Sequence, residues 1–269
     1  MSWKPHGATE EVTYDQLKTV RTPLATRTHY PIPHHKLFDR VVDDLQTMNF
    51  NVKEVRFLIS GKDEGQRFAG EIKIHGMSNA SEEYKLAIFN SHDKSIAAAI
   101  AEGTETKVCA NGCYMGEFTL ARKHTLNVWD AVKGEIRDFV FNLKDRSNII
   151  LDSMNNLREL DFSSNSEVHD FMIQAMKKDY INPTEIKHIL NHWEEPEHHE
   201  FKDRNGYSLF NAHTSHWRSM NPFSLPKKSI NLRNFIYEFK TSTNESSPIS
   251  GDRPSETSEL SRPISDFAF

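Results

Sequence analysis

The chain has 269 residues, 37% of them hydrophobic, which is enough to bury a substantial core. A formal net charge of -5 disfavours a nucleic-acid-binding surface spread over the whole molecule, because phosphate binding needs clustered Lys and Arg. No run approaches about 18 uninterrupted apolar residues and the start lacks the apolar segment of a secretory signal, so we expect a cytoplasmic protein without membrane contact. With only Cys109 and Cys113, a disulfide framework is excluded.

Residues 1–34 are expected to form an extended arm, because few of them are apolar and four prolines interrupt them. A short turn of helix is expected around residues 14–20. From residue 35 to 48 the apolar residues recur at helical spacing, which predicts one amphipathic helix that starts just after Pro33.

The apolar period then changes to near-alternation, which predicts antiparallel strands over residues 52–60, 67–76 and 83–91, joined by the turn-like GKDEG and MSNAS. Three shorter apolar runs follow, SIAAAIAEG, TKVCANG and YMGEFTLA, and glycines separate them. The sheet should therefore have five or six strands.

From about Thr125 the spacing is helical again and predicts one long helix or two consecutive ones, ending near Leu157. Four more helices are expected: one capped by Ser166, one opening at NPTE, and two in NGYSLFNAHTSHW and SINLRNFIYEFK. Strands first and helices afterwards indicate an α+β fold, with residues 35–124 and 125–240 packed as one globular body.

Residues 241–269 are rich in Ser, Pro and acidic side chains, so we expect a disordered acidic tail. The tail ends in an apolar tip, where Asp266, Phe267 and Phe269 predict a short anchor for a partner protein. This form resembles the C-terminal tips of bacterial and phage single-stranded-DNA-binding proteins, which recruit replication and repair enzymes. An inert frayed end is the alternative interpretation.

The polar cluster NSHDKS, residues 90–95, has three interpretations. His92 and Asp93 are competent catalytic groups, with His124 brought near by the fold, although neighbours on a strand point to opposite faces. Alternatively, a basic strip contacts nucleic-acid phosphates, and its members are Lys94, Lys107, Arg122 and Lys123. In the third interpretation the cluster is a tight turn whose side chains satisfy its own backbone.

His188 and His192 lie four residues apart in a predicted helix, which is a workable geometry for two zinc ligands, and His198 is a candidate third ligand. A structural role at a helix end is the alternative. The chain has no Walker loop, no GxGxxG and no paired zinc-ribbon cysteines, so we predict no cofactor.

Several segments in order, PIPHHKLFDRVVDDL, NSHDKS, VCANG, ARKHT and FNAHT, together resemble the phage- and plasmid-borne domain-of-unknown-function 932 family. One departure is His213 within FNAHT, where an aromatic residue is expected. The resemblance covers most of residues 30–237 and implies a bacterial or phage cytosol and the biology of mobile elements. The order of a helix, an antiparallel meander and a long helix is also similar to the core of phage single-strand annealing proteins, which assemble as rings or filaments.

The leading hypothesis is a non-enzymatic protein of phage or mobile-element DNA metabolism that binds or anneals single-stranded DNA through the basic strip, with a partner-recruiting tail and homo-oligomeric assembly. A counter-defence protein that binds and inhibits a host immune complex is the alternative, and an enzyme built on His92, Asp93 and His124 is the second alternative.

Overall fold

A computed structural model describes residues 10–61, 64–107, 112–217, 220 and 225–245. It confirms the α+β class, with one antiparallel sheet and a helical second half. The elements in chain order are β1 (Glu10–Val12), α1 (Tyr14–Thr19), α2 (His34–Thr47), β2 (Val52–Ile59), β3 (Arg67–Ser78), β4 (Glu82–Ser91), β5 (Ala98–Thr106), β6 (Gly112–Arg122), α3 (Val128–Phe141), α4 (Leu143–Arg158), α5 (Asn165–Lys177), α6 (Pro183–Glu194), the 3₁₀ turn His199–Phe201, α7 (Gly206–His216) and α8 (Leu225–Glu245).

The sheet has six strands in sequence order, β1 to β6, and every neighbouring pair is antiparallel. Successive strands therefore run in opposite directions, so the turns fall alternately at two ends of the sheet. We call them the histidine end, where β4 and β6 finish, and the junction end, where β4 begins and β5 finishes.

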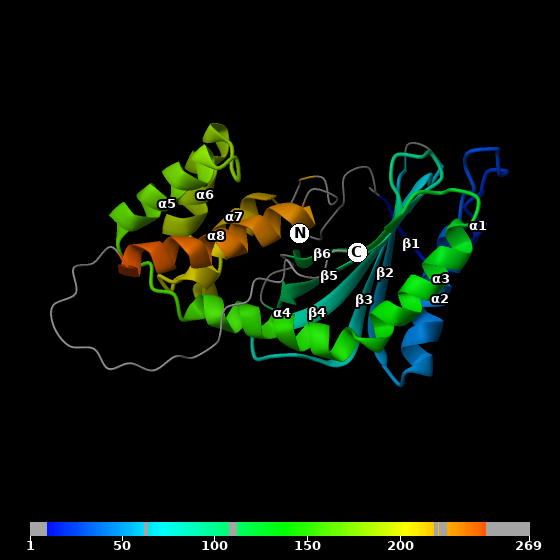
Figure 1. The fold of residues 1–269 in the computed structure, drawn as a ribbon, viewed down its shortest axis with the longest axis horizontal. Coiled ribbons are helices and arrows are strands. Elements are labelled where there is room, and N and C mark those ends of the chain that lie inside the picture. Colours follow the sequence, from blue (N-terminus) through cyan, green and yellow to red (C-terminus); the bar gives the residue numbers. More distant parts are fainter. Residues whose placement is uncertain (1–9, 62–63, 108–111, 218–219, 221–224, 246–269) are drawn as a thin grey trace.

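Alternate strand residues such as Phe68, Ile72, Leu86 and Ile100 are buried on one face, as the period of two predicts. Helices α2, α3 and α4 lie along the sheet, α8 lies beside β6, and α5 to α7 lie with α8 beyond the junction end (Figure 1). Leu37, a buried residue of α2, belongs to the same apolar core.

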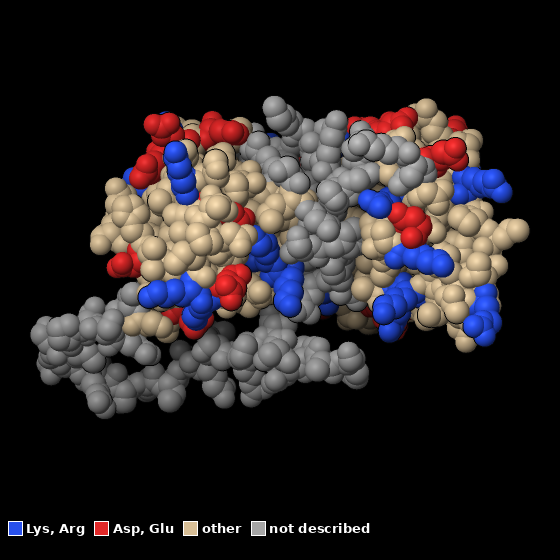
Figure 2. All heavy atoms as spheres, turned by 90° about the horizontal axis from the view of Figure 1, so that it is seen from above, with Lys and Arg blue, Asp and Glu red and all other residues tan. Residues whose placement is uncertain are grey.

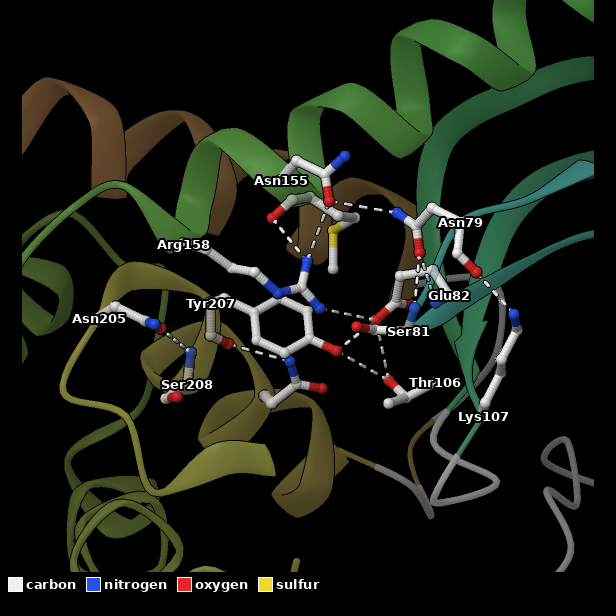
Figure 3. A network of polar contacts seen from close by, with 12 residues as sticks. Asn79, Ser81, Glu82, Thr106, Lys107, Asn155, Arg158, Asn205, Tyr207 and Ser208 are labelled. Carbon is white, nitrogen blue, oxygen red and sulfur yellow. Dashed lines mark hydrogen bonds and ion pairs between the residues drawn. The ribbon is translucent and has the colours of Figure 1, made fainter. Parts of the chain in front are cut away.

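A polar network joins the junction end to the helical bundle (Figure 3). The buried carboxylate of Glu82, at the start of β4, accepts hydrogen bonds from the hydroxyls of Tyr207 on α7 and Thr106 on β5. The Arg158 guanidinium, at the end of α4, lies over the Tyr207 ring with 3.5 Å between its central carbon and the ring centroid. Four elements therefore meet at one carboxylate.

The same network fixes the turn before β4. The Asn79 side-chain oxygen accepts the backbone amides of Ser81 and Glu82, at 2.9 and 2.6 Å, and the Asn79 carbonyl accepts the Lys107 ammonium at 2.6 Å. Close packing continues at the start of α7, because a Cβ on Gly206 would lie 2.9 Å from the Leu157 carbonyl oxygen. The junction end is thus held by internal contacts.

The structure differs from the sequence-based expectations at a few boundaries. A short strand and helix, β1 and α1, form within the predicted arm, and α1 coincides with the turn expected at 14–20. The 125–157 segment is two helices, α3 and α4. Helix α8 continues to Glu245, beyond the predicted start of the tail at 241. Hydroxyls of Thr241 and Ser242 bond the carbonyls four residues earlier, so these polar residues still fit the helix.

None of the helices in the described part of the chain is both long and apolar enough to cross a membrane.

Replacing Tyr207 with Phe should destabilise the protein by about 1–3 kcal/mol, because the buried Glu82 carboxylate loses a hydroxyl donor that it cannot replace with water. Chemical unfolding measures the change. The control is Tyr180→Phe, since the Tyr180 hydroxyl has no hydrogen bond to a described residue and its ring packs beside Phe235. Equal losses in both variants would show that the Tyr207 hydroxyl contributes nothing specific.

Candidate nucleic-acid interface

The NSHDKS cluster forms the end of β4 and the turn to β5, and its side chains bond the turn itself. The Asp93 carboxylate accepts the Ser95 amide at 2.9 Å, and the Ser91 hydroxyl accepts the Ile96 amide at 3.0 Å. Lys94 has a positive φ of 68°, a conformation that a tight turn imposes and that non-glycine residues rarely adopt. The turn therefore projects Lys94 from a rigid backbone.

Asn90 is the hub of a buried polar cluster beneath this turn. Its side-chain nitrogen donates to the Ile32 carbonyl at 2.7 Å and to His34 Nδ1 at 2.9 Å. Its side-chain oxygen lies 2.7 Å from His124 Nε2. The amide thus connects the end of the arm, where α2 starts, with β4 and with the segment after β6, regions that are distant in sequence.

Four histidine rings complete the cluster. The His34 and His92 rings stack with centroids 3.9 Å apart and planes 3° from parallel, and the His29 and His124 centroids are 5.3 Å apart. Each of the four places Nε2 within hydrogen-bonding distance of a carbonyl or amide oxygen. One neutral tautomer, protonated at Nε2, therefore satisfies all four contacts and leaves His34 Nδ1 free to accept from Asn90.

Burial favours the neutral form of three of these rings, those of His34, His92 and His124. It lowers the pKa of His34 to about 3, with the neighbouring His92 as a second cause. It also lowers the pKa of His124 to about 4, and His29 adds to that shift. The pKa of His92 is lowered by burial too, although the Ile32 and Arg21 carbonyls oppose the shift. Near neutral pH these three rings are uncharged, and with His29 and Asn90 they form a structural clamp on the arm.

The clamp positions a set of exposed basic side chains at the histidine end, which we call the basic rim. Every buried histidine of the cluster has a basic residue within two positions in the sequence, and the Arg21 carbonyl faces His92. The rim consists of Arg21, Arg27, Lys36, Lys94 and Lys123, all exposed. Among the described residues, none of the five has a carboxylate within ion-pair distance.

Nearby acidic groups are already occupied. Asp93 accepts Arg67 Nε at 2.8 Å, and although partial burial opposes it, hydrogen bonds from Ser95 and Arg67 lower the Asp93 pKa to about 2. Glu135 pairs with Arg122. In the view of Figure 2, Lys and Arg side chains are distributed over both halves of the face, and Asp and Glu side chains lie mostly along its upper edge.

The structure brings together three of the four predicted phosphate-binding residues. Lys94, Arg122 and Lys123 lie at the histidine end, because Arg122 pairs in register with Ala98 at the start of β5. Lys107 follows the last residue of that strand, about 30 Å away at about 3.3 Å per residue, and its ammonium bonds the Asn79 carbonyl. Lys107 therefore belongs to the junction end, outside the rim. Arg122 can contact a phosphate only if its ion pair with Glu135 is broken.

The catalytic candidates do not form a triad. His92 and His124 do meet in one cluster, but both are buried and hydrogen-bonded to oxygen atoms of the clamp. Asp93 points to Arg67 and Ser95 instead of to a histidine ring. The arrangement fits a structural network better than acid-base catalysis.

The metal-binding candidates do not form a metal-holding group within the described part of the chain. The exposed His188 ring lies parallel to the His216 ring with centroids 5.3 Å apart, and the His198 ring packs edge-on against Phe201. In the part of the chain that the structure describes, His192 included, no three His, Cys, Asp or Glu side chains are arranged to hold a metal ion. The tail candidates Asp266, Phe267 and Phe269 lie outside the described residues.

The distribution of charge along the sequence also indicates the basic rim, although motifs and apolar periodicity do not reveal it. From Gln16 to Phe38 the chain holds Lys18, Arg21, Arg27 and Lys36 but no Asp or Glu, within a protein of net charge -5. A basic stretch without acidic residues is typical of a surface that binds an anionic ligand such as a nucleic acid.

Acidification should destabilise the protein through the clamp. The unfolded chain protonates His34 near pH 6.5, whereas the folded chain resists protonation down to about pH 3, so the unfolded state binds more protons and stability falls as pH falls between these values. For His34 alone the loss at pH 5 is about 2 kcal/mol. Urea unfolding at pH 7.5 and pH 5 measures it.

His34→Gln should flatten this pH dependence, and the exposed-histidine control His75→Gln should keep it. Burial raises the pKa of Glu82, which stabilises the fold on acidification, but that contribution is common to both variants and cancels. Equal pH dependence in His34→Gln and His75→Gln would contradict the clamp.

The domain of unknown function DUF932 matches residues 31–234, a span that runs from the clamp through the sheet to α8. The chain has no match among curated proteins or solved structures. Because the family model covers well over half of the sequence, the chain belongs to the DUF932 family.

Proposed function

We propose that this protein binds single-stranded DNA through the basic rim at the histidine end of the sheet, as a non-enzymatic component of phage or mobile-element DNA metabolism. One observation supports this proposal most: five basic side chains lie around one buried clamp and have no carboxylate partner among the described residues. They are Arg21, Arg27, Lys36, Lys94 and Lys123. Free Lys and Arg side chains on a fixed backbone suit phosphate contacts.

The clamp supports this proposal because it positions charge from separate segments. The Tyr30 amide donates to the His124 carbonyl at 2.9 Å, and His92 Nε2 lies 3.0 Å from the Ile32 carbonyl oxygen. These bonds hold the arm, the β4–β5 turn and the end of β6 side by side, so their basic side chains act on the same ligand. Such pre-positioned side chains lose less conformational freedom on binding.

A net acidic protein is compatible with such a site. Exposed charges act over a Debye length of about 8 Å at physiological ionic strength, so the rim is screened from distant carboxylates. The order of a helix and an antiparallel meander, which α2 and β2 to β6 provide, is similar to the core of single-strand annealing proteins, although the helical segment that follows is divided into α3 and α4; this analogy favours DNA annealing as the role. The C-terminal tip would recruit a protein partner.

Binding of a fluorescent 30-nucleotide dT strand, measured by anisotropy between 50 and 300 mM salt, tests the proposal. We expect log K to fall linearly with log salt concentration. The triple variant Arg27→Gln, Lys94→Gln and Lys123→Gln should reduce the slope by about 2, because each lost contact to a single strand removes about 0.7.

The matched control removes the same charge elsewhere, with Lys107→Gln, Lys144→Gln and Lys177→Gln, all exposed residues away from the histidine end. It should keep the wild-type slope. Absence of binding at about 50 mM salt would refute the proposal. Equal loss in the two triple variants would show non-specific attraction without a rim site, and capture of a host protein instead of DNA would favour the counter-defence alternative.

A further inference from the structure

An aromatic ring lies beside the basic rim. Trp129 is the second residue of α3, six positions after Lys123, and its side chain is half-buried. The Lys36 ammonium is 4.7 Å from the centroid of the Trp129 ring, and the Lys133 ammonium is 5.9 Å from it. One member of the rim therefore rests on the indole.

This contact is weakly held. Lys36 is exposed and has no ion-pair partner among the described residues, whereas Lys133 also pairs with Asp130 at 2.7 Å. An exposed cation–π contact contributes less than base stacking on an aromatic side chain. A phosphate that attracts Lys36 would at the same time uncover the ring.

Two apolar residues, Leu126 and Val128, lie close to Trp129 in the sequence. Leu126, in the segment before α3, is 67% exposed. The neighbouring Val128 is buried in the core and anchors the start of the helix, so the indole sits on a fixed base. Apolar surface next to unpaired cations matches the two parts of a nucleotide strand, the base and the phosphate.

We propose that Trp129 is the surface on which a base of a bound single strand stacks, with Lys36 moving from the ring to a phosphate. This inference rests on the proposed function and adds selectivity to it. Bases in a duplex are already stacked, so a duplex offers the rim only its phosphates, and Trp129 makes the site prefer single strands.

Substitution of Trp129 separates stacking from charge. Trp129→Ala should weaken binding of the dT strand about 5- to 150-fold, the effect of losing one base–aromatic stack, and leave the salt slope unchanged because no charge is removed. Affinity for a duplex of equal length should stay the same. The matched control is Phe141→Ala, which removes a 77% exposed ring from the last residue of α3, about 18 Å along the same helix.

A spectroscopic test keeps the inference falsifiable if Trp129→Ala folds poorly. In a Trp3→Phe background the remaining tryptophans are Trp129, Trp193 and Trp217, and the last two are buried at 4% and 1% exposure. Addition of the dT strand should quench tryptophan fluorescence, and the further change Trp129→Phe should abolish the quenching while binding persists, because Phe still stacks.

The outcomes distinguish the two proposals. If the wild-type protein binds neither single strands nor duplex, both proposals fail. If it binds the dT strand with the expected salt slope but Trp129→Ala binds equally well and quenching survives in Trp129→Phe, the stacking inference is wrong and the basic rim stands. A loss in Phe141→Ala equal to that in Trp129→Ala would also overturn the inference.

Discussion

The side-chain amide of Asn90 is a buried group whose donors and acceptor all have to be matched inside the protein. It uses them on the Ile32 carbonyl, His34 and His124. An unmatched buried polar group costs about 1–3 kcal/mol. Displacing any one of these segments would leave a polar atom of the Asn90 side chain without its hydrogen bond and would cost this free energy. The path of the arm, the start of α2 and the exit of β6 are therefore coupled, and the positions of the basic rim depend on this coupling.

The two ends of the sheet use polar side chains in opposite ways. At the junction end, Glu82, Arg158 and Tyr207 face one another and hold the helical bundle, so little charge is left for a ligand. At the histidine end the buried groups include the uncharged side chains of Asn90, His34 and His124, and the charged side chains next to them point outward. A neutral clamp avoids the desolvation cost of burying ions and leaves the surrounding cations unpaired.

This division explains how a protein with a net charge of -5 can present a basic surface. Some of its carboxylates are engaged elsewhere, for example in the ladder across the sheet where Glu71 binds the buried Lys85 at 2.6 Å. The arm contributes no carboxylate between Asp15 and Asp39. The sign of the charge on one part of the surface depends on which segments meet there, and the net charge of the whole chain is a poor guide to it.

The sequence alone determined most of the elements, because apolar periods of two and 3.6 reflect which face of a strand or helix is buried, and its ordered segments indicated the family. It also indicated that NSHDKS satisfies its own turn, a local property. Tertiary structure decided the rest. Lys107 and Lys94 flank the same strand, β5, yet face opposite ends of the sheet, and His29 and His34 join His92 and His124 only after the arm folds back. Periodicity assigns a residue to a face, but which distant segments share that surface depends on long-range pairing and burial, which local sequence does not encode.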